Sequence, residues 1–369
     1  MDGLPAGLRS RQIEGVNGLS VHVLEAGFEE PGRPCVLLLH GFPELAYSWR
    51  NVMVPIAARG FHVVAPDQRG YGRTLGWDGR YDGDLASFGI LNLVRDALAL
   101  IEALGYRSVA AVVGHDFGSP VAAYCALIRP DVFRSVALMS APFSGPPSLT
   151  EGGRLDPRIH DELARLTPPR KHYQWYFSRP EADDEMRFCR QGLSDFLRAY
   201  YHYKSADWPG NTPFPLASWT ASELAKLPRY YVMDLEKGMA ETVAEAMPSP
   251  AEVAACSWLN AGELEVYAAE FGRTGFQGGL QWYRCGTLPR LAGELSLFAG
   301  RTIDVPSCFI AGKSDWGIYQ SPGQLERMQT RASTNMRFCR LVEGAGHWVQ
   351  QERPEQVSAM LGEFLSLSR

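Results

Sequence analysis

Three residues of the chain could together form a nucleophile, an acid and a base. Asp116 lies at the centre of Gly114-His-Asp-Phe-Gly118, between an apolar run typical of a strand and a segment typical of a helix. A sharp turn at such a junction needs small flanking residues, because larger side chains would collide with the strand and the helix. A carboxylate held there can displace a leaving group at a saturated carbon, and the resulting ester can then be hydrolysed. The competing interpretation is that Asp116 only caps the next helix.

An acid and a histidine follow Asp116 along the chain. Asp315 comes just after the strand-like run 307–311, and His347 lies in Gly344-Ala-Gly-His347-Trp after the last predicted strand. The order nucleophile, acid, histidine is the one that this type of turn predicts. Asp315 would fix the tautomer of His347 and stabilise its charged form. His347 alone could be a histidine of a surface loop, and only its combination with the other two residues favours a catalytic base.

The segment His40-Gly-Phe-Pro43 follows the first buried strand and would lie beside the turn. We predict that the backbone N–H groups of Phe42 and Phe117 form an oxyanion hole. Glu44 has two interpretations, an acid that orders the hydrolytic water or an acid on the loop surface. Tryptophans are candidates for the pocket wall, although some of them would instead be core residues: Trp49, Trp175, Trp282, Trp316 and Trp348.

The elements that must position these residues alternate between strands and helices. Continuous apolar runs at 35–39, 61–65, 109–113 and 135–140 predict strands buried on both faces, as in a parallel sheet. Asn17-Gly18 between two alternating runs predicts a hairpin. The pattern predicts an α/β fold with a mostly parallel sheet flanked by helices.

This alternation is interrupted by a long helical and aromatic-rich segment. Strand signals stop after Pro142 and resume only at residues 307–311 and 336–342. We therefore predict one α/β core made of residues 1–143 and 297–369, with residues 144–296 inserted as a helical cap domain.

Composition excludes several classes of protein. A chain of 369 residues with 46% hydrophobic residues can bury a large core, which excludes a disordered or fibrous protein. The net charge of −5, without a basic run, predicts no nucleic-acid partner and no membrane surface. Scattered cysteines and an N-terminal segment without a secretory signal predict a reduced, cytoplasmic protein without a bound metal. A homodimer remains an open alternative.

Together these motifs resemble the α/β-hydrolase superfamily, and within it the epoxide hydrolases. The resemblance covers residues 21–365 and is carried by four segments: His40-Gly-Phe-Pro-Glu44, Asp67-Gln-Arg-Gly-Tyr-Gly72, Gly114-His-Asp-Phe-Gly118 and Gly346-His-Trp348. It implies two tyrosines in the cap that hold the epoxide oxygen. Tyr173 is the first of these, with Tyr176 as the second choice, and Tyr283 is the other.

The resemblance also implies a reaction that needs neither metal nor cofactor. Asp116 would attack an epoxide carbon, the two tyrosines would protonate the oxygen, and His347 would activate water to release a diol. Epoxide and water would be the only partners. Haloalkane and haloacid dehalogenases share the Asp nucleophile, but Phe117 stands where they carry Trp or Arg. A ligand-binding protein without catalysis is the other alternative. The cap tyrosines also lie further apart than is usual, and residues 198–215 are expected to hold the additional length.

Overall fold

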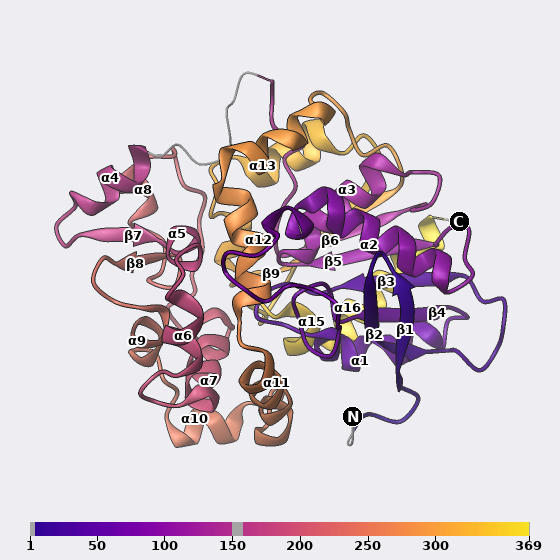
Figure 1. The fold of residues 1–369 in the computed structure, drawn as a ribbon, viewed down its shortest axis with the longest axis horizontal. Helices are drawn as coiled ribbons and strands as arrows, with labels where there is room; N and C mark the ends of the chain where they lie inside the picture. Colours follow the sequence, from indigo (N-terminus) through magenta and orange to yellow (C-terminus); the bar gives the residue numbers. More distant parts are fainter. Residues whose placement is uncertain (1–3, 150–157, 369) are drawn as a thin grey trace.

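One sheet of eight strands organises the protein, whose computed structural model describes residues 4–149 and 158–368. The strand order is β1-β2-β4-β3-β5-β6-β9-β10 (Figure 1). The strands are β1 (Arg9–Val16), β2 (Leu19–Ala26), β3 (Cys35–Leu39), β4 (His62–Pro66), β5 (Ala111–His115), β6 (Val136–Met139), β9 (Ser307–Gly312) and β10 (Met336–Val342). Only the pairings of β2 with β1 and β4 are antiparallel. The predicted mostly parallel sheet is therefore confirmed.

Helices cover both faces of this sheet because its central strands are apolar on both sides. Leu37 of β3 packs in the layer that holds α2 and α3, whereas Leu38 packs in the layer that holds α1 and α16. This alternation follows from the two-residue period of a strand. The helices of this part are α1 (Arg50–Ala57), α2 (Ile90–Ala103), α3 (Gly118–Ile128), α14 (Gln324–Arg327), α15 (Val349–Glu352) and α16 (Pro354–Leu367).

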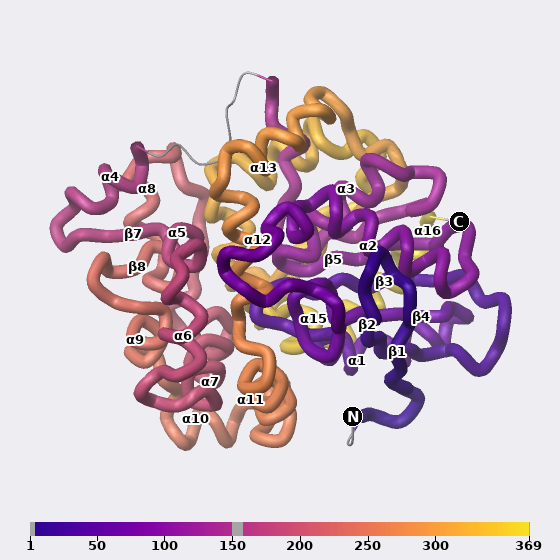
Figure 2. The backbone as a smooth tube through the Cα atoms, in the orientation of Figure 1, coloured from indigo at the N-terminus to yellow at the C-terminus, as the bar shows by residue number. Residues whose placement is uncertain are grey.

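A second group of elements lies between β6 and β9 in the sequence. Figure 2 shows the tube of this group, from α4 to α13, beside the strands of the sheet, and β9 follows α13 in the sequence. Its helices are α4 (Arg158–Ala164), α5 (Tyr173–Phe177), α6 (Ala182–Arg187), α7 (Leu193–Lys204), α8 (Ala221–Leu224), α9 (Met239–Ala244), α10 (Pro250–Ala255), α11 (Ala261–Thr274), α12 (Gln277–Thr287) and α13 (Pro289–Gly293). A two-stranded antiparallel ribbon, β7 (Arg170–His172) with β8 (Val232–Asp234), joins them, and the helical sequence pattern does not predict it.

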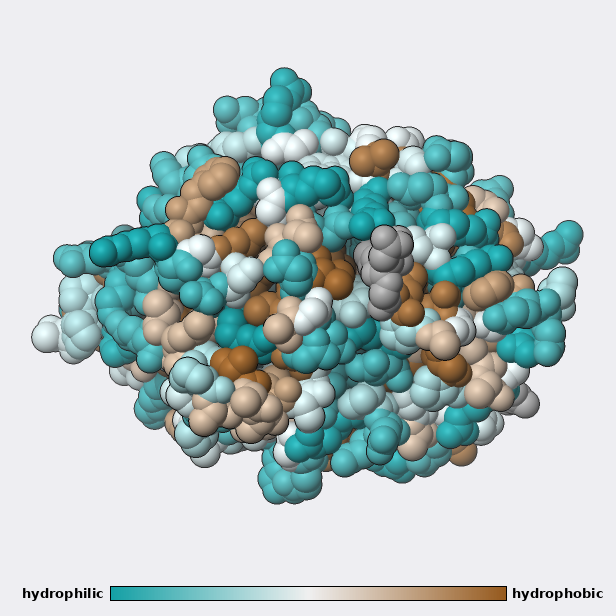
Figure 3. Space-filling view, turned by 90° about the horizontal axis from the view of Figure 1, so that it is seen from below, coloured by the Kyte–Doolittle hydropathy of each residue, from teal (hydrophilic) through white to brown (hydrophobic). Residues whose placement is uncertain are grey.

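The surface is mixed in character. Figure 3 shows a face on which hydrophilic residues predominate and apolar residues gather in small patches near the middle. Within residues 4–149 and 158–368, no helix combines the length and apolarity that crossing a bilayer requires.

Candidate active site

Asp116 occupies a tight turn between β5 and α3. Its φ of 50° lies in the left-handed region, and a Cβ on either flanking glycine would collide with backbone. The added atom would be 2.0 Å from the Gly118 oxygen for Gly114, and 2.3 Å from the Leu39 oxygen for Gly118. Helix α3 is capped by Phe117 without a side-chain hydrogen bond, so the alternative that Asp116 only caps a helix is wrong.

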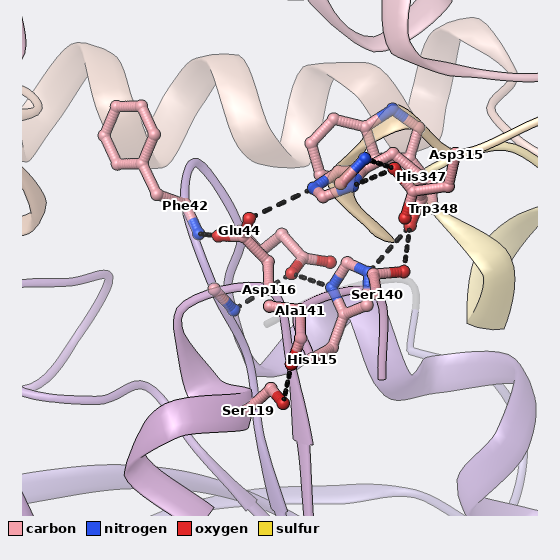
Figure 4. A network of polar contacts seen from close by, with 12 residues as sticks. Phe42, Glu44, His115, Asp116, Ser119, Ser140, Ala141, Asp315, His347 and Trp348 are labelled. Carbon is pink, nitrogen blue, oxygen red and sulfur yellow. Dashed lines mark hydrogen bonds and ion pairs between the residues drawn. The ribbon is translucent and has the colours of Figure 1, made fainter. Parts of the chain in front are cut away.

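The carboxylate of Asp116 points toward two other segments. Its Oδ1 accepts a hydrogen bond from the Phe42 N–H at 2.9 Å, and its Oδ2 lies 3.2 Å from His347 Nε2. Gly41 allows this approach, since a Cβ there would be 2.4 Å from the Cβ of Asp116. The turn, the loop after β3 and the loop after β10 therefore meet at one carboxylate (Figure 4).

Asp315 holds the other side of the His347 ring. Its Oδ1 lies 3.0 Å from His347 Nδ1 and also accepts the N–H of Gly317 at 2.7 Å. Both Asp315 and His347 are buried. This contact requires a proton on Nδ1 and directs Nε2 toward Asp116 (Figure 4). The three residues predicted as a catalytic set are thus joined through His347, which contacts both carboxylates.

Buried charges shift the pKa values of this group. Burial and the Lys204 ammonium lower the pKa of His347, but Asp315 and Asp116 outweigh them and raise it to about 9. Burial raises the pKa of Asp116, yet the hydrogen bond and charge of His347 bring it well below its ordinary value. At neutral pH the pair is therefore a carboxylate and an imidazolium.

Glu44 is buried beneath this site rather than exposed on a loop. Its Oε2 accepts the Gly41 N–H at 2.9 Å and lies 2.6 Å from His115 Nδ1, while its Oε1 accepts the Gln350 amide at 2.8 Å. His115 Nε2 in turn lies 2.7 Å from the backbone oxygen of His347. The surface interpretation of Glu44 is wrong, because this acid joins the loop that carries Phe42 to the backbone of His347.

Two tyrosine rings contact each other near the Asp116 turn, and one of them packs directly on it. Tyr173 begins α5 and Tyr283 lies on α12, and their ring centroids are 5.8 Å apart. Tyr283 also packs edge-on against Phe42 at 5.5 Å and against Phe117 at 5.2 Å. The hydroxyl of Tyr173 donates to Gln320 Oε1 at 3.2 Å. Burial and the nearby Asp116 charge raise the pKa of Tyr283 well above its ordinary value.

Tyr176 lies elsewhere in the same helix. Its ring contacts Phe177 and has Lys171 Nζ at 5.1 Å from its centroid. A Cβ on Gly238 would be 3.3 Å from the Tyr176 hydroxyl, which places that hydroxyl beside the start of α9. Of the two tyrosines predicted on α5, it is Tyr173 that contacts Tyr283.

Known proteins resemble this chain over nearly its whole length. The family described as the alpha/beta hydrolase fold matches residues 34–354. Epoxide hydrolase A of Mycobacterium tuberculosis is 34% identical over 98% of each chain. The chain belongs to the epoxide hydrolases. An epoxide hydrolase of Caballeronia sordidicola is 32% identical, over 95% of this chain and 91% of its own.

Solved epoxide hydrolases share the fold as well. The enzyme from an endophytic Streptomyces is 31% identical with a TM-score of 0.77, covering 98% of this chain and 96% of the other. Potato (Solanum tuberosum) epoxide hydrolase I is 30% identical with a TM-score of 0.74, covering 98% of this chain and 99% of the other.

Three of the five tryptophans proposed as pocket walls, Trp49, Trp175 and Trp316, lie in different surroundings. Trp49 is fully buried in the layer with α1 and α16, and no described residue of the 144–296 segment belongs to that cluster. Its prediction as a wall is wrong, because the ring fills the core. Trp175 packs between His160 and His172, and Trp316 packs on Phe214 at 4.9 Å. A role for either in the pocket stays a prediction.

Sequence reasoning missed Lys204, the last residue of α7. This lysine is buried, and its backbone oxygen accepts the His347 N–H at 2.9 Å. The segment expected to carry additional length, 198–215, therefore includes backbone that holds the histidine of this epoxide hydrolase. The available signal is a lone cation in the aromatic run Tyr200-Tyr-His-Tyr-Lys204.

Proposed function

We propose that the protein hydrolyses an epoxide to a vicinal diol through a covalent ester on Asp116. The observation that carries this proposal is the position of the Asp116 carboxylate, which lies between the Phe42 N–H and His347 Nε2. The Tyr283 ring packs on Phe117 of the same turn, and the Tyr173 ring contacts Tyr283. A carboxylate nucleophile, a base and phenolic acids are the groups that the two steps need.

In the first step, Asp116 forms a bond to an epoxide carbon while the ring C–O bond breaks. The oxygen takes a proton from Tyr173 or Tyr283, which leaves a hydroxyl on the ester and a tyrosinate that solvent protonates. An alkoxide is more basic than a phenolate, so a phenol can donate this proton. Tyr173 and Tyr283 act here as a pair of donors that holds the oxygen from two helices, α5 and α12.

In the second step, water attacks the ester carbonyl carbon. Alkylation neutralises Asp116, so His347 loses one of the two carboxylates that raise its pKa, and its proton leaves to solvent. The neutral ring then removes a proton from water, with Asp315 holding its other nitrogen. The N–H groups of Phe42 and Phe117 stabilise the oxyanion. Collapse breaks the acyl C–O bond, the diol oxygen takes the proton from the imidazolium, and Asp116 is restored.

The origin of the new oxygen tests this scheme. With enzyme in excess over an aryl epoxide in H₂¹⁸O, the label should enter the Asp116 carboxylate and not the diol of the first turnover. Mass spectrometry of the peptide around Asp116 measures the label in the carboxylate, and mass spectrometry of the diol measures the label in the product. A label in the first-turnover diol would show direct attack by water and overturn the ester.

Two variants and a substrate panel complete the test. His347→Gln should accumulate the ester, and Asp116→Asn should form none. Halide release from haloalkanes without diol formation would instead support a dehalogenase, and saturable binding without turnover would support a binding protein. The panel should contain epoxides, haloalkanes and haloacids, so that each alternative has its own substrate.

We further propose that residues 144–296 act as a cap domain and that the enzyme works in the cytoplasm. Its seven cysteines are unpaired, which a reducing compartment maintains. Cell fractionation tests the location. Light scattering tests whether the chain forms the homodimer that its sequence leaves open.

A further inference from the structure

Lys204 places a buried ammonium group inside a cage of aromatic rings. Its Nζ lies 5.2 Å from the ring centroids of Tyr231 and Trp348, 5.4 Å from that of Tyr200 and 5.9 Å from that of Tyr230. The side chain is 4% exposed. Such ring faces attract a cation and replace part of the water that burial removes.

In the part of the chain that the structure describes, no acid forms an ion pair with this ammonium. Among the ion pairs and hydrogen bonds of residues 4–149 and 158–368, none involves Lys204 Nζ. Burial lowers the pKa of Lys204, while three buried carboxylates at the site oppose that effect: Asp116, Asp315 and Glu44. The positive charge therefore interacts with all three carboxylates and does not form an ion pair with one of them.

Backbone contacts fix Lys204 relative to His347. The His347 N–H donates to the Lys204 oxygen at 2.9 Å, and a Cβ on Gly346 would be 2.7 Å from that oxygen. The indole N–H of Trp348 donates to the backbone oxygen of Tyr201 at 2.9 Å. The end of α7 and the histidine loop thus form one tightly packed unit, in which the Trp348 ring contacts both the Lys204 ammonium and the His347 ring.

We propose that Lys204 is a positioning residue for the second step, whose fixed positive charge keeps His347 unprotonated once Asp116 has become an ester. This inference rests on the proposed function, because it needs the ester to form. It assigns the cap a part in the chemistry and not only in admitting the substrate.

The charges that face His347 change through the cycle. Two carboxylates contact the ring, Asp116 of the β5–α3 turn and Asp315 after β9. His115 of β5 has its ring centroid 5.2 Å from that of His347, and Lys204 of α7 contributes the positive charge. Glu352 of α15 accepts the backbone N–H groups of Gly346 and Trp348, on either side of His347. In the free enzyme, two carboxylates in contact with the ring hold the imidazolium. In the ester only Asp315 remains in contact, and Lys204 then opposes it. Without Lys204, Asp315 would keep the ring protonated, and water would lack its base.

The same charge is compatible with the first step. Lys204 and His347 both lower the pKa of Asp116, so the nucleophile stays ionised. One fixed cation therefore favours the reactive form of Asp116 before alkylation and that of His347 after it.

Lys204→Met tests the inference, because methionine fills the cage without a charge. Single-turnover kinetics should show ester formation within a few-fold of the wild type. Ester hydrolysis should be about tenfold slower at pH 7, and its pH midpoint should rise by about one unit, so that the rate recovers at higher pH. Lys204→Arg should keep the wild-type midpoint.

Lys171→Met is the matched control, since Lys171 is also buried in the cap against an aromatic ring but faces Arg179, Glu185 and Glu241. It should leave the midpoint unchanged. Equal slowing of Lys204→Met at every pH, or an unchanged midpoint, would overturn the proposal. A wild type that makes no diol would overturn the proposed function instead, and the two failures are thereby separate.

A direct titration covers the case in which Lys204→Met turns over too little to measure. Asn at position 116 is neutral like the ester, so NMR of His347 in Asp116→Asn reports the ring without its negative partner. Adding Lys204→Met, or Lys204→Gln if the methionine variant does not fold, should raise the titration midpoint of His347. No rise would contradict the role given to Lys204.

Discussion

At the scale of single residues, each oxygen of the Asp116 carboxylate has its own close partner. Asp116 has one oxygen at the Phe42 N–H and the other at His347 Nε2, and the ring of Tyr283 lies against Phe42 and Phe117. The side chains of Asp116, His347 and Tyr283 can each be replaced by one of similar shape, so the two steps of the reaction can be studied separately.

The two cap tyrosines give a prediction about the first step. Tyr173→Phe and Tyr283→Phe should each slow ester formation by about 10²-fold, because each removes one donor to the epoxide oxygen. Ester hydrolysis should change far less. Rapid-mixing fluorescence separates the two rates. Tyr176→Phe is the control, since its hydroxyl lies beside α9, and a comparable slowing there would contradict the assignment.

The raised pKa of His347 gives a prediction about stability. A folded-state pKa of about 9 against an ordinary 6.5 means that the folded enzyme binds this proton more tightly than the unfolded chain does. The contribution, on the order of 3 kcal/mol, is complete below pH 6.5 and is lost as pH rises through 9. Urea unfolding at pH 6 and pH 10 should show a larger loss for the wild type than for His347→Gln. Equal losses of stability in the two proteins would contradict the contribution given to the His347 proton.

At the scale of elements, the turn between β5 and α3 leaves no room for side chains around Asp116. Gly118 lies where the start of α3 contacts the end of β3, and this close approach fixes the position of Asp116 relative to the sheet. The glycines belong to the packing of strands and helix as much as to the motif.

A pair of glycine substitutions tests this packing. Gly118→Ala should lower the free energy of unfolding by about 2 kcal/mol and reduce ester formation, because its Cβ would be 2.3 Å from the Leu39 oxygen. Gly286→Ala on α12 should be neutral or stabilising by about 0.5–1 kcal/mol, since nothing lies within 4 Å of its Cβ. Chemical denaturation and single-turnover rates measure both, and similar losses in the two variants would contradict the argument.

The features that the sequence predicts well depend on residues that are close together in the chain. The Asp116 turn, the order of Asp315 and His347, and the buried strands all follow from short runs of residues. The surroundings of Glu44 and Trp49 do not, because their burial depends on distant partners such as Gln350 and α16. Lys204 was missed for the same reason, since its carboxylate neighbours come from the other part of the chain.

At the scale of the whole molecule, α7 connects the cap segment to two loops of the core. The Tyr201 hydroxyl donates to the Pro43 oxygen at 2.7 Å, beside the loop that carries Phe42. Glu352 accepts the Ala206 N–H at 2.9 Å and also the N–H groups of Gly346 and Trp348. The two parts of the chain are therefore hydrogen-bonded at the loops that carry Phe42 and His347.

Removing one of these contacts should affect both stability and rate. Tyr201→Phe leaves the buried Pro43 oxygen without its donor, which costs about 1–3 kcal/mol. We expect a lower urea midpoint and slower ester formation, because the Phe42 loop loses a support. Tyr203→Phe, on the same helix against Trp208 and Tyr230, is the control for ester formation. An unaltered rate in Tyr201→Phe would show that α7 does not position that loop.

The contacts of α7 also limit how the enzyme can be engineered. Chimeras that combine the core of one relative with the cap of another join pieces at the chain crossings near β6 and β9, yet the residues that support Phe42 and His347 lie deep inside the exchanged piece. A donor cap would have to bring its own matching helix end. We therefore expect that functional recombination needs α7 to be inherited together with the loops after β3 and β10, as one block that is discontinuous in sequence.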